Sequence, residues 1–439
     1  MAWEEVKLKE LISEMGDGGT PTTTEPSNFG GNIPWAVVDD VVSNIRSTKE
    51  SLTEKGFKGC SAKKWPIGSI ILTTGATIGQ VGIAEIELCT KQGITGIVVN
   101  NYANAEFLKF FFESNTKQLL RFAQGTTFKE IRPRTLGNLL VLIPKPFTSS
   151  GLAEQTAIAT ILSKVDKAIA ATQNSIKAAE KLKKALMQNL LTGNLKPDGS
   201  WRSENEFYED EKFGKVPKGW HIIKGNKITT KITKGQSPKW QGFEYQDSGI
   251  LFVTSENVRD GYIEIDSPKY LPLEFHKKIK NSQLQKGDLL INIVGASIGR
   301  CAVFNLVVEY ANTNQAVCVF RPDAENDSDF LAYYIQNTHT QQRLLGTQVE
   351  TARANLSLGD FRKFKFVIPE SKDEQMLIST KLNEVNSTIQ NKQTKIQTLQ
   401  RLKKSLMQNL LTGKVRLPQE FIAQFEEAVE EVNKTVTAQ

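Results

Sequence analysis

The sequence predicts an α+β protein: two tandem globular α+β domains, separated by two long helices that form an antiparallel coiled coil, with a pseudo-two-fold internal repeat. The first observation behind this is a duplication within the 439 residues. Segments 181–193 and 401–413 lie about half the chain apart and differ only at Lys181/Arg401 and Ala185/Ser405. The second observation is that each half passes from strand-like runs into a long apolar heptad stripe. A period this long indicates a repeated domain-plus-helix unit rather than a solenoid.

The globular halves are predicted at 1–150 and 214–370. Each contains one amphipathic helix, at 105–123 and at 329–345. The spacing between matching residues drifts within these halves, which indicates loops of different length. Short apolar runs bounded by turn residues are typical of strands, and they occur at 69–73, 94–100, 139–144, 288–294, 315–320 and 364–369. We expect a mostly antiparallel or mixed sheet in each half.

Spacer helices are predicted at 151–193 and 371–413, where the offset between the copies is constant. Both end at a Thr-Gly step, a common helix stop. A helix of about 38 residues within each segment would span roughly 57 Å at 1.5 Å per residue, too long for a buried helix of an ordinary domain. The second globular half must return the chain to the start of the second helix, so the pair should be antiparallel. The two seams of the first helix are Ile158, Val165, Thr172, Ala179, Leu186 and Leu162, Ile169, Ile176, Lys183, Leu190, and the second helix repeats them.

Lysines occupy matching seam positions in the two helices, Lys183 and Lys403, and Lys392 occupies a further seam position of the second helix. Burying them lowers stability, so we expect them to fix the helix register or to face a third partner. Residues 194–213 are rich in turn and charged residues and are interpreted as a linker. The tail at 414–439 lies outside the repeat, and after Pro418 it has the pattern of an acidic amphipathic helix.

The composition of the chain favours an anionic partner and argues against a metal site or a membrane protein. A net charge of +7 and a pI near 9.0 favour an anionic partner such as nucleic acid. The four cysteines show no CxxC spacing and the three histidines are far apart, so we expect reduced thiols and no metal site. The chain has no long apolar run for a membrane span and no apolar signal segment at its start, so the expected location is the cytoplasm.

Three loop positions recur in both halves and carry side chains that reach base edges and phosphates. They are a Gly-rich stretch before Thr20 or Ser237, the Gly-Ala-[Thr/Ser]-Ile-Gly turn, and a polar segment before the last strand. The glycine turn has a structural explanation as well. Gln92 and Gln315 are either base readers or strand-end hydrogen-bonding groups. The candidate DNA-binding residues are Thr20, Thr22, Lys91, Gln92, Thr126, Thr127, Lys129, Arg132, Arg134, Ser237, Lys239, Trp240, Arg300, Asn314, Gln315, Thr351, Arg353 and Asn355.

Catalytic motifs are missing from the sequence. We find no Walker loop, GxSxG or HExxH motif, and no methyltransferase cofactor loop. Asp198, followed by Asp210 and Lys212, mimics the PD…(D/E)xK pattern of metal-dependent nucleases. These acids lie in a linker without a strand pattern, whereas a metal site would need them on adjacent strands, so we interpret the match as accidental. We therefore expect no catalysis, no cofactor and no metal.

The chain resembles the specificity subunits of Type I restriction–modification systems. The resemblance rests on the two Glu-Gln-x-x-Ile-x-x-x-Leu segments beginning at Glu154 and Glu374, the heptads after them, the Leu-Lys-Lys-[Ala/Ser]-Leu-Met-Gln-Asn-Leu-Leu-Thr-Gly ends, and the opening Trp3 and Trp220. It implies two target-recognition domains, each reading one half of a bipartite site in double-stranded DNA, without chemistry of their own. It also implies two methyltransferase subunits as partners and, in the restricting form, motor–nuclease subunits, which carry the cofactors.

Two other classes of function remain compatible with the sequence. A self-contained nuclease would use Asp198, Asp210 and Lys212. A coiled-coil scaffold would bind only protein through its repeated domains, and it would show no sequence-selective, salt-sensitive DNA binding even with a methyltransferase partner present. The basic third loops argue against the scaffold. Two pseudo-equivalent domains on an antiparallel spacer should instead read half-sites of opposite sense about one helical turn apart.

Overall fold

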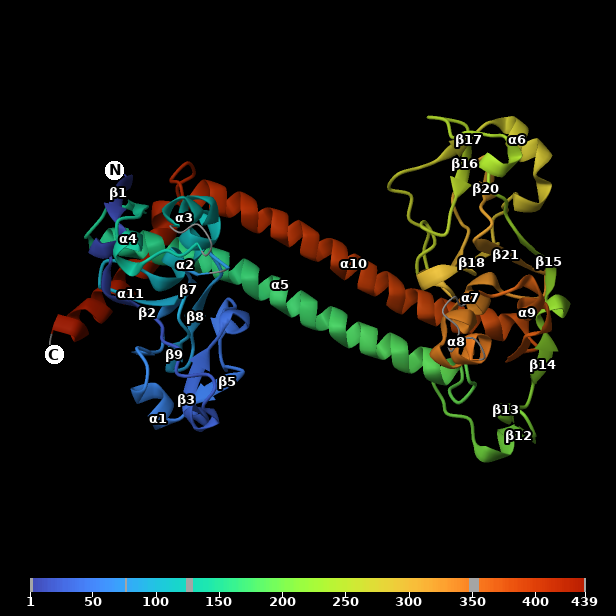
Figure 1. Ribbon diagram of the computed structural model, residues 1–439, viewed down its shortest axis with the longest axis horizontal. Helices are drawn as coiled ribbons and strands as arrows, with labels where there is room; N and C mark the ends of the chain where they lie inside the picture. The colour runs from blue at the N-terminus through green and yellow to red at the C-terminus, as the bar shows by residue number, and fades with distance from the viewer. Residues whose placement is uncertain (1–2, 76, 124–128, 347–354, 438–439) are drawn as a thin grey trace. The chain divides into compact units, whose positions relative to one another are not determined.

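The computed structural model describes residues 3–75, 77–123, 129–346 and 355–437. It divides into two compact units (Figure 1). The first comprises Met1–Asn174 and Thr394–Gln439, and the second comprises Ser175–Gln393. Each unit therefore contains one globular domain, the first half of the long helix that follows it, and the second half of the other long helix. None of the described helices has the length and apolar character needed to cross a membrane.

Unit 1 is built from three small sheets and a buried helix. The first strand of the domain, β1 (Trp3–Lys7), pairs antiparallel with its last strand, β11 (Leu140–Pro144). The central sheet has the order β2 (Ile12–Asp17), β10 (Ile94–Val99), β7 (Ile70–Thr73), β8 (Val81–Ala84), β4 (Asn44–Ile45). The third sheet has the order β5 (Glu50–Leu52), β3 (Phe29–Ala36), β9 (Leu88–Thr90), β6 (Lys64–Trp65). The helices are α1 (Glu54–Lys58), α2 (Ala105–Ser114), α3 (Thr116–Phe122) and α4 (Pro133–Leu136).

Unit 2 repeats this plan. Its opening pair is β14 (Trp220–Lys224) with β22 (Lys365–Pro369). The second sheet has the order β15 (Thr229–Lys234), β21 (Val317–Pro322), β18 (Leu289–Asn292), β19 (Cys301–Val303). The third has the order β17 (Tyr270–Leu271), β16 (Ile250–Val253), β20 (Ala311–Thr313). The helices are α6 (Leu273–Lys278), α7 (Ser328–Gln336), α8 (Thr338–Leu345) and α9 (Leu358–Lys363).

The six predicted strands are confirmed as β7, β10, β11, β18, β21 and β22, and the sheets are mixed. Each predicted amphipathic helix is instead two helices that meet at an asparagine. The Asn115 side chain donates to the Phe111 carbonyl at 2.8 Å and closes α2, whereas the Asn337 side chain accepts from the His339 N–H at 2.9 Å and starts α8. Asparagine competes with helical hydrogen bonding in this way, and the apolar period conceals the break.

The linker has structure that its sequence did not indicate. Strands β12 (Phe207–Asp210) and β13 (Gly214–Pro217) form an antiparallel hairpin. The expectation that Asp210 lies outside any strand was therefore wrong. Its carboxylate accepts from the backbone N–H groups of Lys212 and Phe213, each at 2.9 Å, and so forms the turn. Asp198 likewise accepts from the N–H and hydroxyl of Ser200. Both carboxylates act in local turn chemistry.

The long helices are α5 (Ser149–Leu190) and α10 (Lys372–Leu410), as the heptads predicted. Every seam position in both is buried or half-buried. In unit 1, Ile158 and Leu162 of α5 share a core cluster with Leu410 and Met407 of α10. Farther along, Asp166 of α5 meets Lys403 of α10. Residue numbers rise along one helix as they fall along the other, so the helices are antiparallel there.

The seam lysines contact residues of the opposite helix, as a role in helix register would require, and that role stays a prediction. Lys403 Nζ lies 2.8 Å from carboxylate oxygens of both Glu113 on α2 and Asp166 on α5. Lys183 occupies the equivalent position in unit 2 and donates to Asn386 Oδ1 at 2.8 Å. Burial lowers the pKa of Lys183. Burial would lower the pKa of Lys403 too, but its two acidic partners outweigh that effect and raise it. The same seam position is thus an ion pair in one unit and a hydrogen bond to an uncharged amide in the other.

The tail forms α11 (Gln419–Thr437), which confirms the predicted amphipathic helix. Ile422 and Val429 are buried in a cluster with Ala153 and Ala157 at the start of α5, and Phe421 and Phe425 pack against the same cluster. This helix has no counterpart in unit 2, because the repeat ends before it. It covers the first turns of α5 with an apolar face.

Candidate nucleic-acid interface

In unit 1 the first recurring loop, which contains Gly18 and Gly19, lies against the turn that contains Gln92. The Gly18 and Gly19 N–H groups donate to the Ile94 and Thr90 carbonyls at 3.1 and 2.9 Å. A Cβ on Gly18 would lie 2.3 Å from the Lys91 carbonyl oxygen, so only glycine permits the approach. The Asp17 carboxylate accepts from the Gly93 N–H at 3.1 Å, and burial raises the pKa of Asp17 against that bond.

The other two recurring loops of unit 1, the glycine turn that starts at Gly75 and the polar segment before the last strand, also meet at the turn around Gly93. The N–H groups of Thr74 and Gly75 both donate to the Gly93 carbonyl, at 2.8 and 2.9 Å. The Ile131 N–H donates to the Thr74 carbonyl at 2.8 Å, which brings in the third segment at Lys129–Arg134. Gly93 is therefore the point where loops from four parts of the chain meet, and its φ of +82° suits glycine.

Unit 2 builds the same convergence from different residues. The Gly235 N–H donates to the Asn314 carbonyl at 3.1 Å, and the Ile293 N–H donates to the Ala316 carbonyl at 3.0 Å. The Leu356 N–H donates to the Ile293 carbonyl at 3.0 Å, matching the bond from Ile131 to Thr74 in unit 1. The backbone frame is common to both domains, whereas the side chains on it differ. A frame of this kind can hold two different sets of readers.

The predicted site residues divide into three groups. Lys91, Gln92, Lys239 and Gln315 are exposed on the converging loops, as are Thr22, Lys129, Arg132, Arg134, Trp240 and Asn355. Thr20, Ser237, Asn314 and Arg300 are half-buried; Arg300 lines a hollow with Asp260 and Gln341. Thr126, Thr127, Thr351 and Arg353 lie outside the described residues. The structure brings the loops together, and the contacts of their side chains with DNA stay predictions.

Sequence reasoning missed one basic element beside the first loop. The short helices α1 and α6 occupy matching positions and both carry cations: Lys55 and Lys58 in the first, Lys277 and Lys278 in the second. Lys278 Nζ donates to the Gln241 carbonyl at 3.3 Å, which joins α6 to the first loop of its domain. The run His-Lys-Lys-Ile-Lys at 276–280 was a signal for this element. Such charge next to a reading loop suits phosphate contacts.

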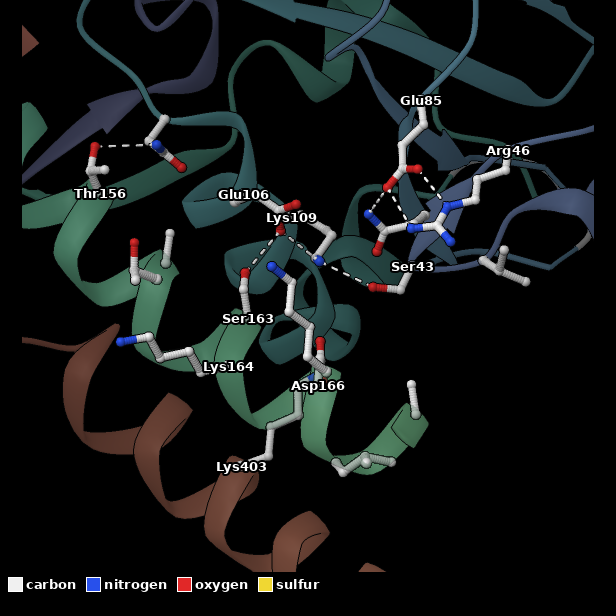
Figure 2. Close-up of a pocket in the computed structure, with 18 of the residues that line it drawn as sticks. Ser43, Arg46, Glu85, Glu106, Lys109, Thr156, Ser163, Lys164, Asp166 and Lys403 are labelled. Carbon is white, nitrogen blue, oxygen red and sulfur yellow. Dashed lines mark hydrogen bonds and ion pairs between the residues drawn. The ribbon is translucent and has the colours of Figure 1, made fainter. Parts of the chain in front are cut away.

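A groove of about 850 Å³ is lined by domain 1 and α5, with Lys403 of α10 also on its wall (Figure 2). On its floor Lys109 is buried, with Nζ 3.1 Å from Ser43 Oγ and 2.7 Å from Glu106 Oε2. Glu106 also accepts from Ser163 of α5 at 3.4 Å. This network ties α2 to both the sheet region and the spacer helix. Its charged groups are paired with one another.

The repeated Glu-Gln step joins each globular domain to the helices. Gln155 accepts from the Asn104 N–H at 3.0 Å and donates to the Tyr102 carbonyl at 3.0 Å, which holds the start of α2. Gln375 accepts from the Asp327 N–H at 2.9 Å at the start of α7. Both glutamine side chains are buried. A buried amide with both ends bonded is a specific attachment, because an unmatched partner would lose hydrogen bonds.

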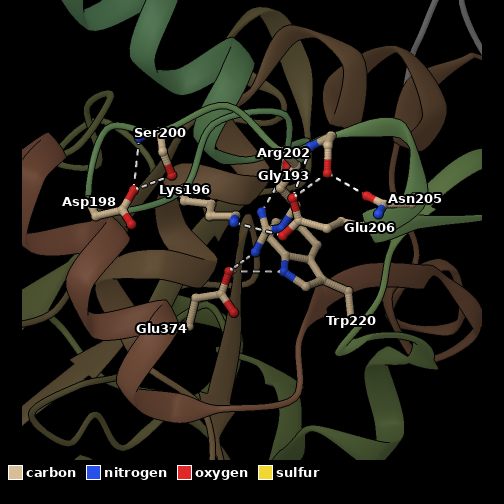
Figure 3. A network of polar contacts seen from close by, with 10 residues as sticks. Gly193, Lys196, Asp198, Ser200, Arg202, Asn205, Glu206, Trp220 and Glu374 are labelled. Atoms are coloured by element: carbon tan, nitrogen blue, oxygen red, sulfur yellow. Dashed lines mark hydrogen bonds and ion pairs between the residues drawn. The ribbon is translucent and has the colours of Figure 1, made fainter.

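The glutamate of each step pairs with an arginine that follows the other helix. Figure 3 shows Glu374 contacting Arg202, with Oε1 2.5 Å from the guanidinium, and accepting from Trp220 Nε1 at 3.1 Å. Arg202 also donates to the Gly193 carbonyl at 2.7 Å, at the end of α5. In unit 1, Glu154 receives two bonds of 2.6 Å from Arg416. In unit 2 these contacts join Trp220, the start of α10 and the end of α5, and in unit 1 they join the start of α5 to the segment that follows α10.

The chain is similar to a known protein family, to several relatives and to a solved structure. A family model described as "Type I restriction modification DNA specificity domain" matches residues 2–181 and 219–401. The Type I restriction enzyme MjaIX specificity subunit of Methanocaldococcus jannaschii is 25% identical, over 94% of each chain. The EcoBI specificity subunit of Escherichia coli is 26% identical, over 86% of this chain and 78% of its own. The crystal structure of the S subunit from M. genitalium has a TM-score of 0.58 at 15% identity, covering 93% of this chain and 96% of its own.

Proposed function

The chain belongs to the Type I restriction–modification DNA specificity family, and we propose that each of its globular domains reads one half of a bipartite DNA site. It is the DNA specificity subunit of such a system, the member without catalysis. The proposal goes further, to the division of labour between the two domains. It also assigns two methyltransferase subunits to the long helices, with DNA methylation on adenine as the chemistry of those partners.

The observation that carries the proposal is the repeated backbone frame with largely different side chains on it. Lys91 stands where the second domain has Asn314, and Thr22 stands where it has Lys239, whereas a glutamine is common to both domains at Gln92 and Gln315. Direct reading of bases depends on which donors and acceptors a side chain presents. Two domains with the same frame and different side chains therefore favour two different half-sites. Two identical half-sites would contradict the proposal.

The helix ends support two equivalent docking sites for a partner. Leu182 and Leu402 are 51% and 46% exposed, and they lie in the segments that are nearly identical in the two copies. Lys184, Lys404, Gln188 and Gln408 are exposed in the same segments. Identical exposed residues in two otherwise divergent halves indicate one surface used twice. A hollow of about 360 Å³ with Lys404 and Gln408 on its wall adjoins the second copy.

Charged substitutions of the two leucines are expected to remove partners one at a time. Leu182→Asp or Leu402→Asp should each leave one methyltransferase subunit bound, and the double variant should leave none, because a carboxylate at a contact centre is desolvated without a partner. Native mass spectrometry of the assembled complex measures the stoichiometry. Val307→Asp, at a fully exposed valine of the second domain, is the matched control and should bind two. Unchanged stoichiometry in the double variant would place the docking surface elsewhere.

Single-molecule mapping of methylated bases in host DNA, with and without this gene, tests the function. Deletion should abolish methylation of one bipartite adenine-containing motif and leave all others. The lost motif gives both half-sites and their spacing. If the set of methylated motifs is the same, the purified chain with its methyltransferase subunits should be tested for sequence-selective binding directly. Absence of such binding across a range of salt concentrations would refute the proposal.

A further inference from the structure

Trp240 is held on a rigid turn with its side chain in solvent. The indole is 84% exposed, the highest value among the aromatic residues whose burial is described. The turn is closed by bonds from the Gln241 and Phe243 N–H groups to the Pro238 carbonyl, at 2.8 and 3.1 Å. Gly242 then turns the chain in a left-handed conformation, with φ of +80°. An exposed tryptophan on a fixed backbone is prepared for contact at little entropic cost.

The turn is anchored from behind, which leaves the indole free. Phe243 packs edge-on against Phe275 of α6 with ring centroids 5.4 Å apart, and Phe275 packs against Phe252 at 5.8 Å. Lys278 Nζ lies 5.4 Å from the centroid of the Phe243 ring. The loop is thus attached to the domain through Phe243, which packs against Phe275. Trp240 takes no part in these ring contacts and is largely exposed.

Lysines occur in the turn and on the neighbouring helix α6, of which Lys278 contacts the turn directly. Lys239 precedes Trp240 and is exposed, and Lys277, Lys278 and Lys280 are exposed on and just after α6. No acidic residue lies between Lys234 and Phe243 in the sequence. A neutral indole among cations suits a partner with both negative charge and flat apolar faces. Nucleic acid has this combination, since its phosphates flank stacked bases.

The first domain has no such residue at the matching turn. Pro21 corresponds to Pro238, and Thr22, Thr23 and Thr24 follow it, all exposed. The loops that start from Gly19 and Gly235 therefore share a base and differ at the tip. A contact made by the Trp240 indole therefore has no aromatic counterpart in the matching turn of the first domain.

We propose that Trp240 inserts its indole at a base step of the half-site read by the second domain, partly unstacking that step. The inference rests on the proposed function, because it needs that domain to bind DNA. Apolar wedges open base steps in this way, preferentially at flexible pyrimidine–purine steps. The second half-site is then recognised in part through its deformability. The first half-site is read without such a wedge.

The test uses the full chain with its methyltransferase subunits and duplexes that carry the motif found by methylation mapping. 2-Aminopurine is placed at each position of the second half-site in turn. We expect its fluorescence to rise on binding at one step, and Trp240→Ala to abolish the rise while lowering affinity about ten- to a hundredfold. Trp240→Phe should keep part of both effects. Trp201→Ala is the matched control, since Trp201 is 65% exposed in the linker, and it should behave as wild type.

The salt dependence separates stacking from charge. Trp240→Ala should leave the slope of log affinity against log salt unchanged, because an indole releases no counterions, whereas Lys277→Ala should reduce it by about one. Wild-type affinity and fluorescence in Trp240→Ala would overturn the inference and leave the proposed function standing. Loss of the methyltransferase subunits rather than of DNA in that variant would also overturn it, in favour of a protein contact. Lack of selective DNA binding by the wild-type complex would instead refute the proposed function.

Discussion

Removing one heptad from each long helix should shift methylation to sites whose half-sites are about three base pairs closer together. Seven residues shorten a helix by about 10 Å, and the rise of DNA is about 3.4 Å per base pair. The two half-sites themselves should not change, because the reading loops lie far from the deleted turns. Methylation mapping of host DNA with the deletion variant measures the gap directly.

The structure defines which heptads to remove. Asp166 faces Lys403 in unit 1 and Lys183 faces Asn386 in unit 2, so the same number of residues separates the two contacts on each helix. Deleting 173–179 from α5 and 390–396 from α10 therefore takes out matched turns between these contacts. A whole heptad keeps both seams in place, since the apolar pattern repeats every seven residues.

Deleting a heptad from one helix only is the control. It leaves seam residues unmatched and should abolish methylation instead of changing the gap. The prediction fails if the paired deletion is active with the original gap, since the spacing would then be set by something other than helix length.

Replacing Glu374 with alanine should lower the free energy of unfolding by about 3 kcal/mol, the low end of the effect of breaking a buried ion pair. Arg202 has a side chain only 8% exposed, and it would lose its carboxylate partner. Trp220 Nε1 would lose its acceptor as well. The result is an unpaired charge at the junction of the domain and both helices. Chemical denaturation of the full-length chain measures the loss.

Two variants make the test specific. Glu384→Ala removes an exposed acid of the same helix and should change stability by less than about 0.5 kcal/mol. Glu374→Gln keeps an acceptor for both partners and should fall between the two. Equal stability of Glu374→Ala and Glu384→Ala would show that the contact does not hold the unit together.

Several elements could be predicted because their signals are local. The heptads of α5 and α10 and their Thr-Gly ends follow from residues within a few turns of one another. Strands β7, β10 and β18 follow from short apolar runs between turn residues. The breaks at Asn115 and Asn337 and the β12–β13 hairpin were not predicted, because side-chain bonding to the backbone there overrides the apolar period.

The sequence by itself determined the duplication, the two classes of segment and the candidate loops, because repeats and periods are properties of the chain order. Only the tertiary structure decided that Asp17, Thr74, Gly93 and Ile131 meet at one place, since hydrogen bonds between such distant residues leave no periodic trace. It also decided that Trp220 is buried against Glu374 whereas Trp240 stands in solvent. The two residues are chemically identical, and the neighbours that folding brings to each determine whether it stabilises the domain or is free to bind.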